Sequence, residues 1–274
     1  MPPASGYAAS NGAAYERFIG RWTARLAREI AARSPTPAPG PLLDVGCGTG
    51  SLSAALAARH PDRAITGIDP AAAYLDFARA REDCAQVTFA SGDAQALDAE
   101  DGTFAGVYAA IVLNFLPDPA AAAHEMRRVL CAGGLGVAAG WDFRGGLVYQ
   151  RLLWDSAASL DPDAAALRDR LFSHPLALPD GLESLWREAG FTDVTRDEVT
   201  IRMDFAEFDD YWRPLLGGQG PVGGYVAGLE PDLRRRVEAA VRAAFLSGSP
   251  DGPRSLTATA WLVSGYAPNG DARP

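Results

Sequence analysis

The sequence predicts an α/β fold in which helices cover both faces of a doubly wound, seven-stranded and mostly parallel sheet. Short, continuous apolar runs alternate with amphipathic helical patterns over residues 42–140, which is typical of parallel strands buried on both faces. Two later runs, residues 194–203 and 256–263, alternate like strands and complete the expected seven. Helical patterns at about 144–178 and 204–254 separate these late strands, and we expect them to be helical lid insertions.

The boundaries of the early elements follow from the apolar runs and from the residues that break them. Strands are expected at residues 42–45, 64–68, 86–90, 104–112 and 135–140. Helices are expected between them at residues 51–59, 71–81 and 119–130. In such a sheet, ligands bind at the edge where the parallel strands have their carboxyl ends.

The chain begins with a segment that differs from the rest. Between residues 12 and 33, apolar side chains recur at helical spacing, at Tyr15, Phe18, Ile19, Trp22, Leu26 and Ile30. The Pro-rich segment 34–41 cannot continue this helix and is expected to be a linker. We therefore expect a helical cap and linker at residues 1–41 and a main domain at residues 42–274.

The late part of the chain predicts a lid. Residues 205–216 and 231–246 are expected helices, and the run 217–224, with five glycines in eight residues, is expected to be a flexible connection between them. The first of these helices carries its aromatic residues mostly on one face, at Phe205, Phe208, Tyr211 and Trp212. We expect this face to close over the site, with Tyr211 or Trp212 in contact with substrate.

Composition restricts the possible partners. The net charge is −9, and all 25 basic residues are arginines, so the surface is acidic and does not favour nucleic-acid binding. The three cysteines are scattered, which favours a reducing compartment and argues against a metal site. No apolar stretch is long enough to cross a bilayer, and no secretory leader is visible. The sequence predicts a soluble, cytoplasmic protein and leaves the oligomeric state open.

A glycine-rich turn follows the first expected strand. Asp44 ends that strand, and Gly46, Gly48 and Gly50 let a ligand approach the main chain closely before a helix begins. A dinucleotide-binding turn would need Gly or Ala at position 51, where this chain has serine. The carboxylate of Asp44 would also repel a pyrophosphate and attract a ligand with an ammonium group. A nicotinamide-dependent oxidoreductase therefore remains only a weaker alternative.

Four motifs in the same order resemble those of the class I S-adenosylmethionine-dependent methyltransferases, over roughly residues 42–142. They are Asp-Val-Gly-Cys-Gly-Thr-Gly at 44–50, Ile-Thr-Gly-Ile-Asp-Pro at 65–70, Ser-Gly-Asp-Ala at 91–94, and Glu-Met-Arg-Arg-Val-Leu at 125–130 followed by Gly133-Gly134. The resemblance implies a Rossmann-like fold and S-adenosyl-L-methionine as cofactor. It also implies cofactor-binding residues, which are Asp44, Gly46, Cys47, Gly48, Gly50, Asp69, Pro70, Asp93 and Ala94. In such a site Asp69 binds the ribose hydroxyls, and Asp93 and Ala94 bind the adenine edge.

The N-terminal segment Tyr15–Trp22 is similar to the leader of small-molecule methyltransferases of the ubiquinone and menaquinone biosynthesis type. This resemblance implies a helix that folds over the cofactor, with Tyr15 beside it and Arg21 facing its methionine carboxylate. Asn114, after the fourth strand, is expected near the transferred methyl group. Because Asn-Phe-Leu-Pro at 114–117 lacks the Asn/Asp-Pro-Pro-Tyr tetrad of adenine and glutamine methyltransferases, a small-molecule acceptor is favoured.

The residues that would act on the acceptor are less well determined. The candidates are Asn114, Trp141, Asp142, His174 and Tyr211, which lie in loops or on the expected lid. Methyl transfer from a sulfonium mainly needs alignment, so a general base is required only for a protonated acceptor. The methylated atom, O, N or C, stays open. So does the alternative of a protein that binds S-adenosylmethionine for regulation without methylating.

Overall fold

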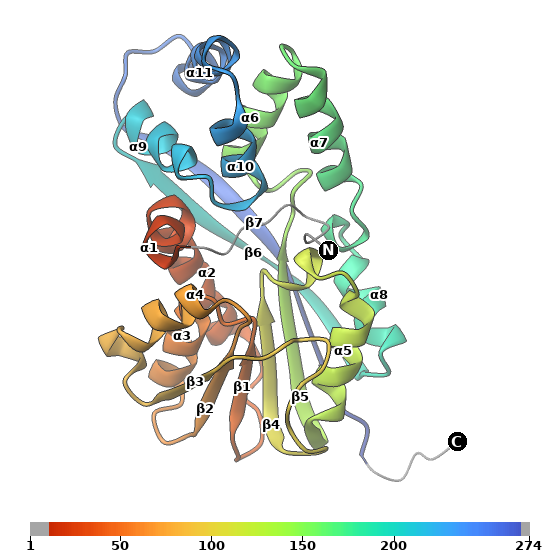
Figure 1. Ribbon diagram of the computed structural model, residues 1–274. Coiled ribbons are helices and arrows are strands. Elements are labelled where there is room, and N and C mark those ends of the chain that lie inside the picture. The colour runs from red at the N-terminus through yellow and green to blue at the C-terminus, as the bar shows by residue number, and fades with distance from the viewer. Residues whose placement is uncertain (1–10, 270–274) are drawn as a thin grey trace.

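A seven-stranded sheet with the order β3-β2-β1-β4-β5-β7-β6 forms the centre of the protein in a computed structural model that describes residues 11–269 (Figure 1). The strands are β1 (Leu42–Val45), β2 (Ile65–Ile68), β3 (Val87–Ala90), β4 (Phe104–Ala110), β5 (Leu130–Trp141), β6 (Thr192–Phe205) and β7 (Arg254–Tyr266). Strands β1 to β5 pair in parallel, and β7 runs antiparallel to both β5 and β6. The predicted doubly wound, mostly parallel α/β sheet is confirmed.

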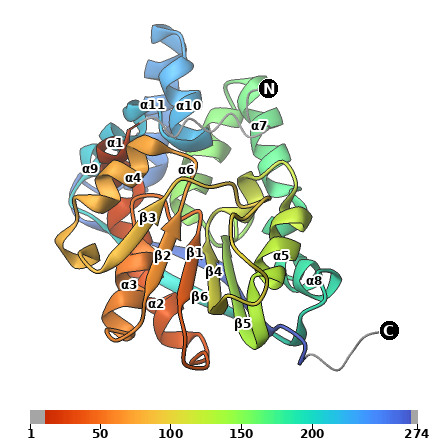
Figure 2. The ribbon, with the colours of Figure 1, turned by 60° about the horizontal axis from the view of Figure 1, so that its bottom comes forward.

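Helices cover both faces of this sheet. The longer ones are α2 (Arg21–Arg33), α3 (Ser51–Arg59), α4 (Ala72–Arg79), α5 (Pro119–Arg128), α6 (Val148–Ala158), α7 (Pro162–Phe172), α8 (Gly181–Glu188), α10 (Gly220–Gly228) and α11 (Pro231–Leu246). The short ones are α1 (Gly12–Tyr15), η2 (Glu82–Cys84), η3 (Leu113–Phe115), η4 (Pro175–Ala177), α9 (Phe208–Trp212) and η5 (Arg213–Gly217). Figure 2 shows α2, α3 and α4 on one side of the sheet, and α5 and α8 on the other.

The N-terminal helix is continuous from α1 to α2 through one π-helical segment, η1 (Glu16–Gly20). Its side chains Trp22, Leu26 and Ile30 are buried, and α2 packs against α3 and β6. The helix predicted for residues 12–33 is confirmed. Residues 1–10 of the expected N-terminal cap lie outside the described part of the chain.

A helical cap, composed of α6, α7, α9, α10 and α11, stands at one end of the sheet (Figure 1). The long strands β6 and β7 pair with each other along almost their whole length and extend into this cap. Pro162 opens α7 behind the N-cap Asp161, so the predicted break between two helices is correct. Buried residues of α2, the sheet and the cap form one continuous apolar cluster.

Two expectations for the cap are wrong. Phe205 does not begin a helix: it is the last residue of β6 and pairs with Arg254, and α9 begins only at Phe208. The run 217–224 is not simply a connection, because α10 begins at Gly220. Burial of Val222 and Val226 offsets the low helix propensity of its glycines. No helix among residues 11–269 is long and apolar enough to cross a membrane.

Candidate functional site

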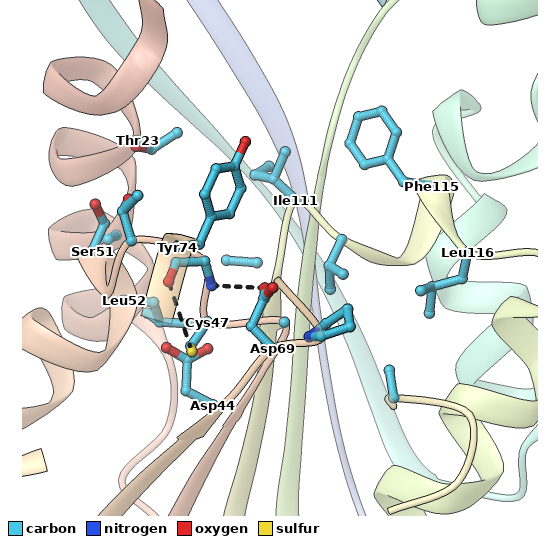
Figure 3. A pocket seen from close by; sticks show the side chains of 18 of the residues that line it. Thr23, Asp44, Cys47, Ser51, Leu52, Asp69, Tyr74, Ile111, Phe115 and Leu116 are labelled. Atoms are coloured by element: carbon cyan, nitrogen blue, oxygen red, sulfur yellow. Dashed lines mark hydrogen bonds between the residues drawn. The ribbon is translucent and has the colours of Figure 1, made fainter. Parts of the chain in front are cut away.

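A cavity of about 440 Å³ lies at the carboxyl ends of β1, β2 and β4 (Figure 3). The glycine loop after β1, the turns after β2 and β3, and residues 110–117 after β4 form most of its wall. One face of α2 and the first residues of α3 complete it. The cavity therefore occupies the edge of the sheet at which parallel α/β proteins bind ligands.

The glycine loop keeps its backbone conformation because it lacks side chains at the critical positions. Gly46, Gly48 and Gly50 all have positive φ angles, of 68°, 54° and 85°. A Cβ atom on Gly46 would lie 2.5 Å from Cγ2 of Val112, on the other side of the cavity floor. The loop thus presents its main chain to the cavity and leads directly into the N-terminus of α3.

Asp69, at the end of β2, faces the glycine loop. Its Oδ2 accepts a hydrogen bond from the backbone N–H of Gly48 at 3.0 Å (Figure 3). Its Oδ1 accepts one from the backbone N–H of Ala71 at 2.8 Å. The side chain is 8% exposed, and burial raises the pKa of its carboxyl group. A carboxylate oxygen can accept more than one hydrogen bond, so Asp69 has capacity left to accept bonds from two neighbouring hydroxyl groups of a ligand.

Asp44, at the end of β1, is the second carboxylate of the cavity. It is 1% exposed, and its Oδ2 accepts a hydrogen bond from Oγ of Ser53 at 2.6 Å. Burial, with a smaller contribution from the charge of Asp69, raises the pKa of this carboxyl group to about 7, although the hydrogen bond from Ser53 acts to lower it. A ligand with an ammonium group would stabilise the ionised form, so the residue fits a cationic ligand group.

The turn after β3 brings Asp93 and Ala94 to the same cavity. Oδ1 of Asp93 accepts hydrogen bonds from the backbone N–H of Gln95 at 2.9 Å and from its Nε2 at 3.2 Å. Oε1 of Gln95 in turn accepts from the backbone N–H of Asp118, just before α5. Two loops at this edge are therefore held together.

The N-terminal helix closes the cavity from above. The ring of Tyr15 packs on that of Tyr74 from α4, with 5.2 Å between the ring centroids. The hydroxyl of Tyr74 donates to Oε1 of Gln219 at 3.3 Å, at the start of α10. Glu16 accepts a hydrogen bond from Oγ1 of Thr49, in the glycine loop, at 2.5 Å. Cavity, N-terminal helix and helical cap are therefore in direct contact.

The segment after β4 supplies an apolar wall. Ile111 points into the cavity from a backbone with a φ angle of 59°, and its N–H donates to the carbonyl of Ala139 at 2.7 Å (Figure 3). A β-branched residue in this region is strained, and such strain is concentrated at functional sites. The rings of Phe115 and Phe143 meet edge to face at 6.4 Å. Asn114 lies in the short helix η3, immediately before Phe115. Its Oδ1 is buried without a hydrogen-bond partner among residues 11–269.

Seven of the predicted site residues lie outside the lining of this cavity. Gly50 and Asn114 are neighbours of lining residues in the chain, and the other five are engaged elsewhere. Arg21 forms an ion pair with Asp210 of α9, 2.9 Å long, and lies over the ring of Trp22 instead of facing a bound methionine carboxylate. Trp141 is buried within the sheet. Asp142 accepts from the backbone of Gly145 at 2.8 Å.

The other two belong to the cap and its approach. Nδ1 of His174 accepts from the backbone N–H of Leu176 at 3.2 Å and so caps η4. The hydroxyl of Tyr211 donates to the carbonyl of Tyr149 at 2.7 Å, deep in the cap. Tyr211, predicted to contact substrate, therefore lies outside the cavity lining, because the aromatic face of α9 packs inward.

Sequence reasoning missed four residues around the cavity. Tyr74 and Gln219 meet across 145 residues, and Glu16 and Thr49 across 33. No local pattern reports such pairs. Thr49 lies inside the glycine motif, which was the one available signal.

The comparisons with known proteins agree with this geometry. Residues 42–134 match a family model described as a methyltransferase domain. An O-methyltransferase of Penicillium expansum is 34% identical over 72% of this chain and 68% of its own length. A demethylmenaquinone methyltransferase of Roseiflexus castenholzii is 31% identical over 70% of this chain and 83% of its own length. The chain belongs to the class I S-adenosylmethionine-dependent methyltransferases.

Other similarities are more partial. The trans-aconitate 2-methyltransferase of Methylobacterium radiotolerans is 39% identical, but the match covers 46% of each chain. Phosphoethanolamine N-methyltransferase 2 of Haemonchus contortus, solved with S-adenosyl-L-methionine, superposes with a TM-score of 0.57 over 94% of this chain and 56% of its own. At 16% identity, that likeness shows the fold alone.

S-adenosyl-L-methionine is the cofactor of this methyltransferase, and the residues of the cavity fit it. Asp44 suits an ammonium group, Asp69 suits a pair of hydroxyl groups, and the glycine loop leaves its main chain accessible. Methyl transfer is accordingly the activity that the family supports. Neither a nicotinamide-dependent oxidoreductase nor a non-catalytic regulator is favoured.

Proposed function

We propose that this methyltransferase acts on a small-molecule acceptor that enters the same cavity beside Ile111 and Phe115. The observation that carries the proposal is that two buried carboxylates, Asp44 and Asp69, face one cavity from the two sides of the glycine loop. An apolar wall continues from this polar part, at Ala110, Ile111 and Phe115. The cavity thus combines a polar cofactor half with an apolar half.

Each cofactor residue has a role that its geometry supports. Asp69 accepts the ribose hydroxyls, while its bonds to Gly48 and Ala71 fix the carboxylate. Asp44 holds the methionine ammonium group. The remaining cofactor positions in the cavity lining contribute backbone groups or apolar contact along the loop and the adenine, at Gly46, Cys47, Pro70, Asp93 and Ala94. Gly50 contributes through the positive φ angle that ends the loop before α3. Tyr15 covers the cofactor from the N-terminal helix.

The bound cofactor supplies a methyl group on a positively charged sulfur. The chain aligns a lone pair of the acceptor with that methyl group: the new bond to carbon forms as the S–CH₃ bond breaks, and the bonding electrons stay on sulfur. A hydroxyl or amine acceptor also releases one proton to water. No histidine lines the cavity among residues 11–269, and alignment and exclusion of water are the contributions that its lining supports.

We also propose that residues 42–274 form the methyltransferase domain and that the N-terminal segment covers its cofactor. The contacts Tyr15–Tyr74 and Glu16–Thr49 support this division of roles. The insertions at about 144–178 and 204–254 supply the helices of the cap. The scattered cysteines support a reducing, cytoplasmic location, and the acidic composition supports an enzyme that does not act on nucleic acid.

Calorimetric titration tests the first part of the proposal. The full chain should bind S-adenosylmethionine and S-adenosylhomocysteine and should not bind NAD. Incubation with a panel of small hydroxylated and aminated acceptors should then yield S-adenosylhomocysteine together with products heavier by one CH₂. If neither cofactor form bound to folded protein, the proposed function would be wrong.

A further inference from the structure

The charges around the cavity are distributed very unevenly. Among its described lining residues, three are charged and all are carboxylates: Asp44, Asp69 and Asp93. None of these lining residues is an arginine or a histidine, and the chain contains no lysine. An acceptor that enters this cavity therefore meets anionic and uncharged groups only.

The arginines near the cavity are turned away from it. Helix α2 faces the cavity with Thr23, Leu26, Ala27 and Ile30. Its arginines lie on other faces: Arg21 pairs with Asp210, and Arg25 pairs with Asp204 at 3.0 Å.

Two further arginines, Arg33 and Arg81, are also paired with acidic side chains. Arg33 pairs with Glu29 at 3.2 Å. Arg81 approaches the glycine loop at the carbonyl of Thr49, 3.5 Å away, and its charge is paired with Asp83 at 2.8 Å. A carboxylate or phosphate in the cavity would find none of these guanidinium groups free to face it.

The wall after β4 is also unsuited to an anion. Ala110, Ile111 and Val112 offer hydrocarbon, and Phe115 and Leu116 continue it. Burial of an ionised group without a partner of opposite charge is strongly unfavourable. The hydrogen bond from Ile111 N–H to the carbonyl of Ala139 fixes the backbone from which this side chain enters the cavity.

We propose that the acceptor of this enzyme is uncharged and largely apolar, and that the cavity excludes carboxylates and phosphates. This inference rests on the proposed function, since it concerns the acceptor of the same site. Selection arises because an anion would lose its hydration and gain no cationic side chain of the protein, whereas an apolar molecule would gain contact with Ile111, Phe115 and α2.

A matched pair of ligands tests it. The full chain is first loaded with sinefungin, an unreactive analogue of the cofactor that keeps a positive charge in place of the methylated sulfur. Neutral 1-naphthol and anionic 1-naphthoate, which share the same ring system, are then titrated at pH 7.5, with trans-aconitate as a trianion. We expect 1-naphthol to bind at least about tenfold more tightly than either anion.

The outcomes separate the two proposals. If sinefungin itself does not bind, the proposed function fails. If sinefungin binds and 1-naphthoate or trans-aconitate binds as tightly as 1-naphthol, only the inference about charge is wrong. The same conclusion follows if sinefungin binds and 1-naphthol does not.

Substitution of Phe115 by arginine adds a positive charge to this apolar wall. Phe115→Arg should narrow or invert the preference for 1-naphthol by improving 1-naphthoate binding. Phe115→Leu, which shortens the same side chain without adding charge, should keep the preference for the neutral ligand. An unchanged preference in a folded, sinefungin-binding Phe115→Arg variant would contradict the inference. The wild-type comparison decides the question independently if this variant does not fold.

Discussion

Two tyrosines of this protein, Tyr15 and Tyr211, have similar sequence patterns around them but different surroundings in the structure. Tyr15, with helical spacing in the N-terminal segment, packs on Tyr74 and lines the cavity. Tyr211, with the same spacing in α9, packs against Phe205 and Phe245, with 5.5 and 5.3 Å between ring centroids, and lies outside the cavity lining. Helical spacing identifies which face is buried, but not what buries it.

The largest effect on stability is expected for Tyr211, if its ring belongs to the packed interior of the cap and not to a substrate-binding lid. Tyr211 is 3% exposed, and Tyr211→Ala would leave a cavity in the aromatic cluster and remove the hydrogen bond to the carbonyl of Tyr149. We expect a loss of about 3–5 kcal/mol of unfolding free energy, measured by urea denaturation, with unchanged cofactor affinity at low temperature. Tyr211→Phe is the matched control and should lose about 1 kcal/mol, that of one hydrogen bond. A stable Tyr211→Ala variant with impaired turnover would instead restore the lid.

A substitution of Asp69 tests whether the cavity beside Tyr15 holds the cofactor. Asp69→Ala removes the charged acceptor beneath Tyr15 and Tyr74 and should weaken S-adenosylmethionine binding by about 1.5–3 kcal/mol. Calorimetric titration measures the change, and Asp62→Ala, an exposed aspartate before β2, is the control that should bind normally. Equal affinities of the two variants would show that Asp69 does not contact the ribose.

The sequence predicted the sheet and the two carboxylates at the strand ends that line the cavity, for physical reasons that the cap does not share. The strand that contains Asp44 is a short apolar run before a glycine turn, so both its boundary and its acid follow from local chemistry. Phe205 is different, because long-range pairing with β7 extends β6 to Phe205 before α9 begins. The helix at Gly220 depends on buried contacts of Val222 and Val226, which overcome glycine propensity.

The parts of the site that the sequence did not predict also depend on contacts between distant segments. Glu16 and Thr49 are distant in sequence, and the strained backbone of Ile111 depends on a bond to the neighbouring strand β5. Neither leaves a periodic pattern. Local chemistry therefore predicts the motif-bearing turns, whereas tertiary contacts determine what closes over them.

Asp44 makes a pH-dependent prediction. Its pKa, raised to about 7 by burial, exceeds that of the unfolded chain, so the folded apoprotein holds this proton longer. Stability from this group is therefore present below about pH 4 and is lost as the pH rises towards 7. Cofactor binding has the opposite sign, because the ammonium group needs the carboxylate: affinity should rise between pH 6 and pH 8, the range around that raised pKa.

Asp44→Asn separates these two effects. It should lower S-adenosylmethionine affinity roughly tenfold at pH 8 while raising the melting temperature of the apoprotein there. Near pH 4.5 the difference in melting temperature should largely vanish. Thermal melts and titrations at both pH values measure this, and a variant that is destabilised at pH 8 would contradict a raised pKa.

The smallest expected effect concerns the hydrogen bond between Glu16 and Thr49, by which the N-terminal helix holds the glycine loop. Gly20 leaves room for the Glu16 carboxylate, since a Cβ atom at residue 20 would collide with it. Glu16→Ala and Thr49→Val should each weaken S-adenosylmethionine binding by about 1 kcal/mol, and the double variant should lose little more, because each change removes the same bond. Glu16→Gln and Thr49→Ser keep the acceptor and the donor, so they should retain most of the affinity. Additive losses in calorimetric titration would mean that the two residues act separately. In that case the N-terminal helix would cover the cofactor through the aromatic ring of Tyr15 alone, without help from the bond between Glu16 and Thr49. Tyr15 would then resemble Tyr211 in acting only through aromatic packing.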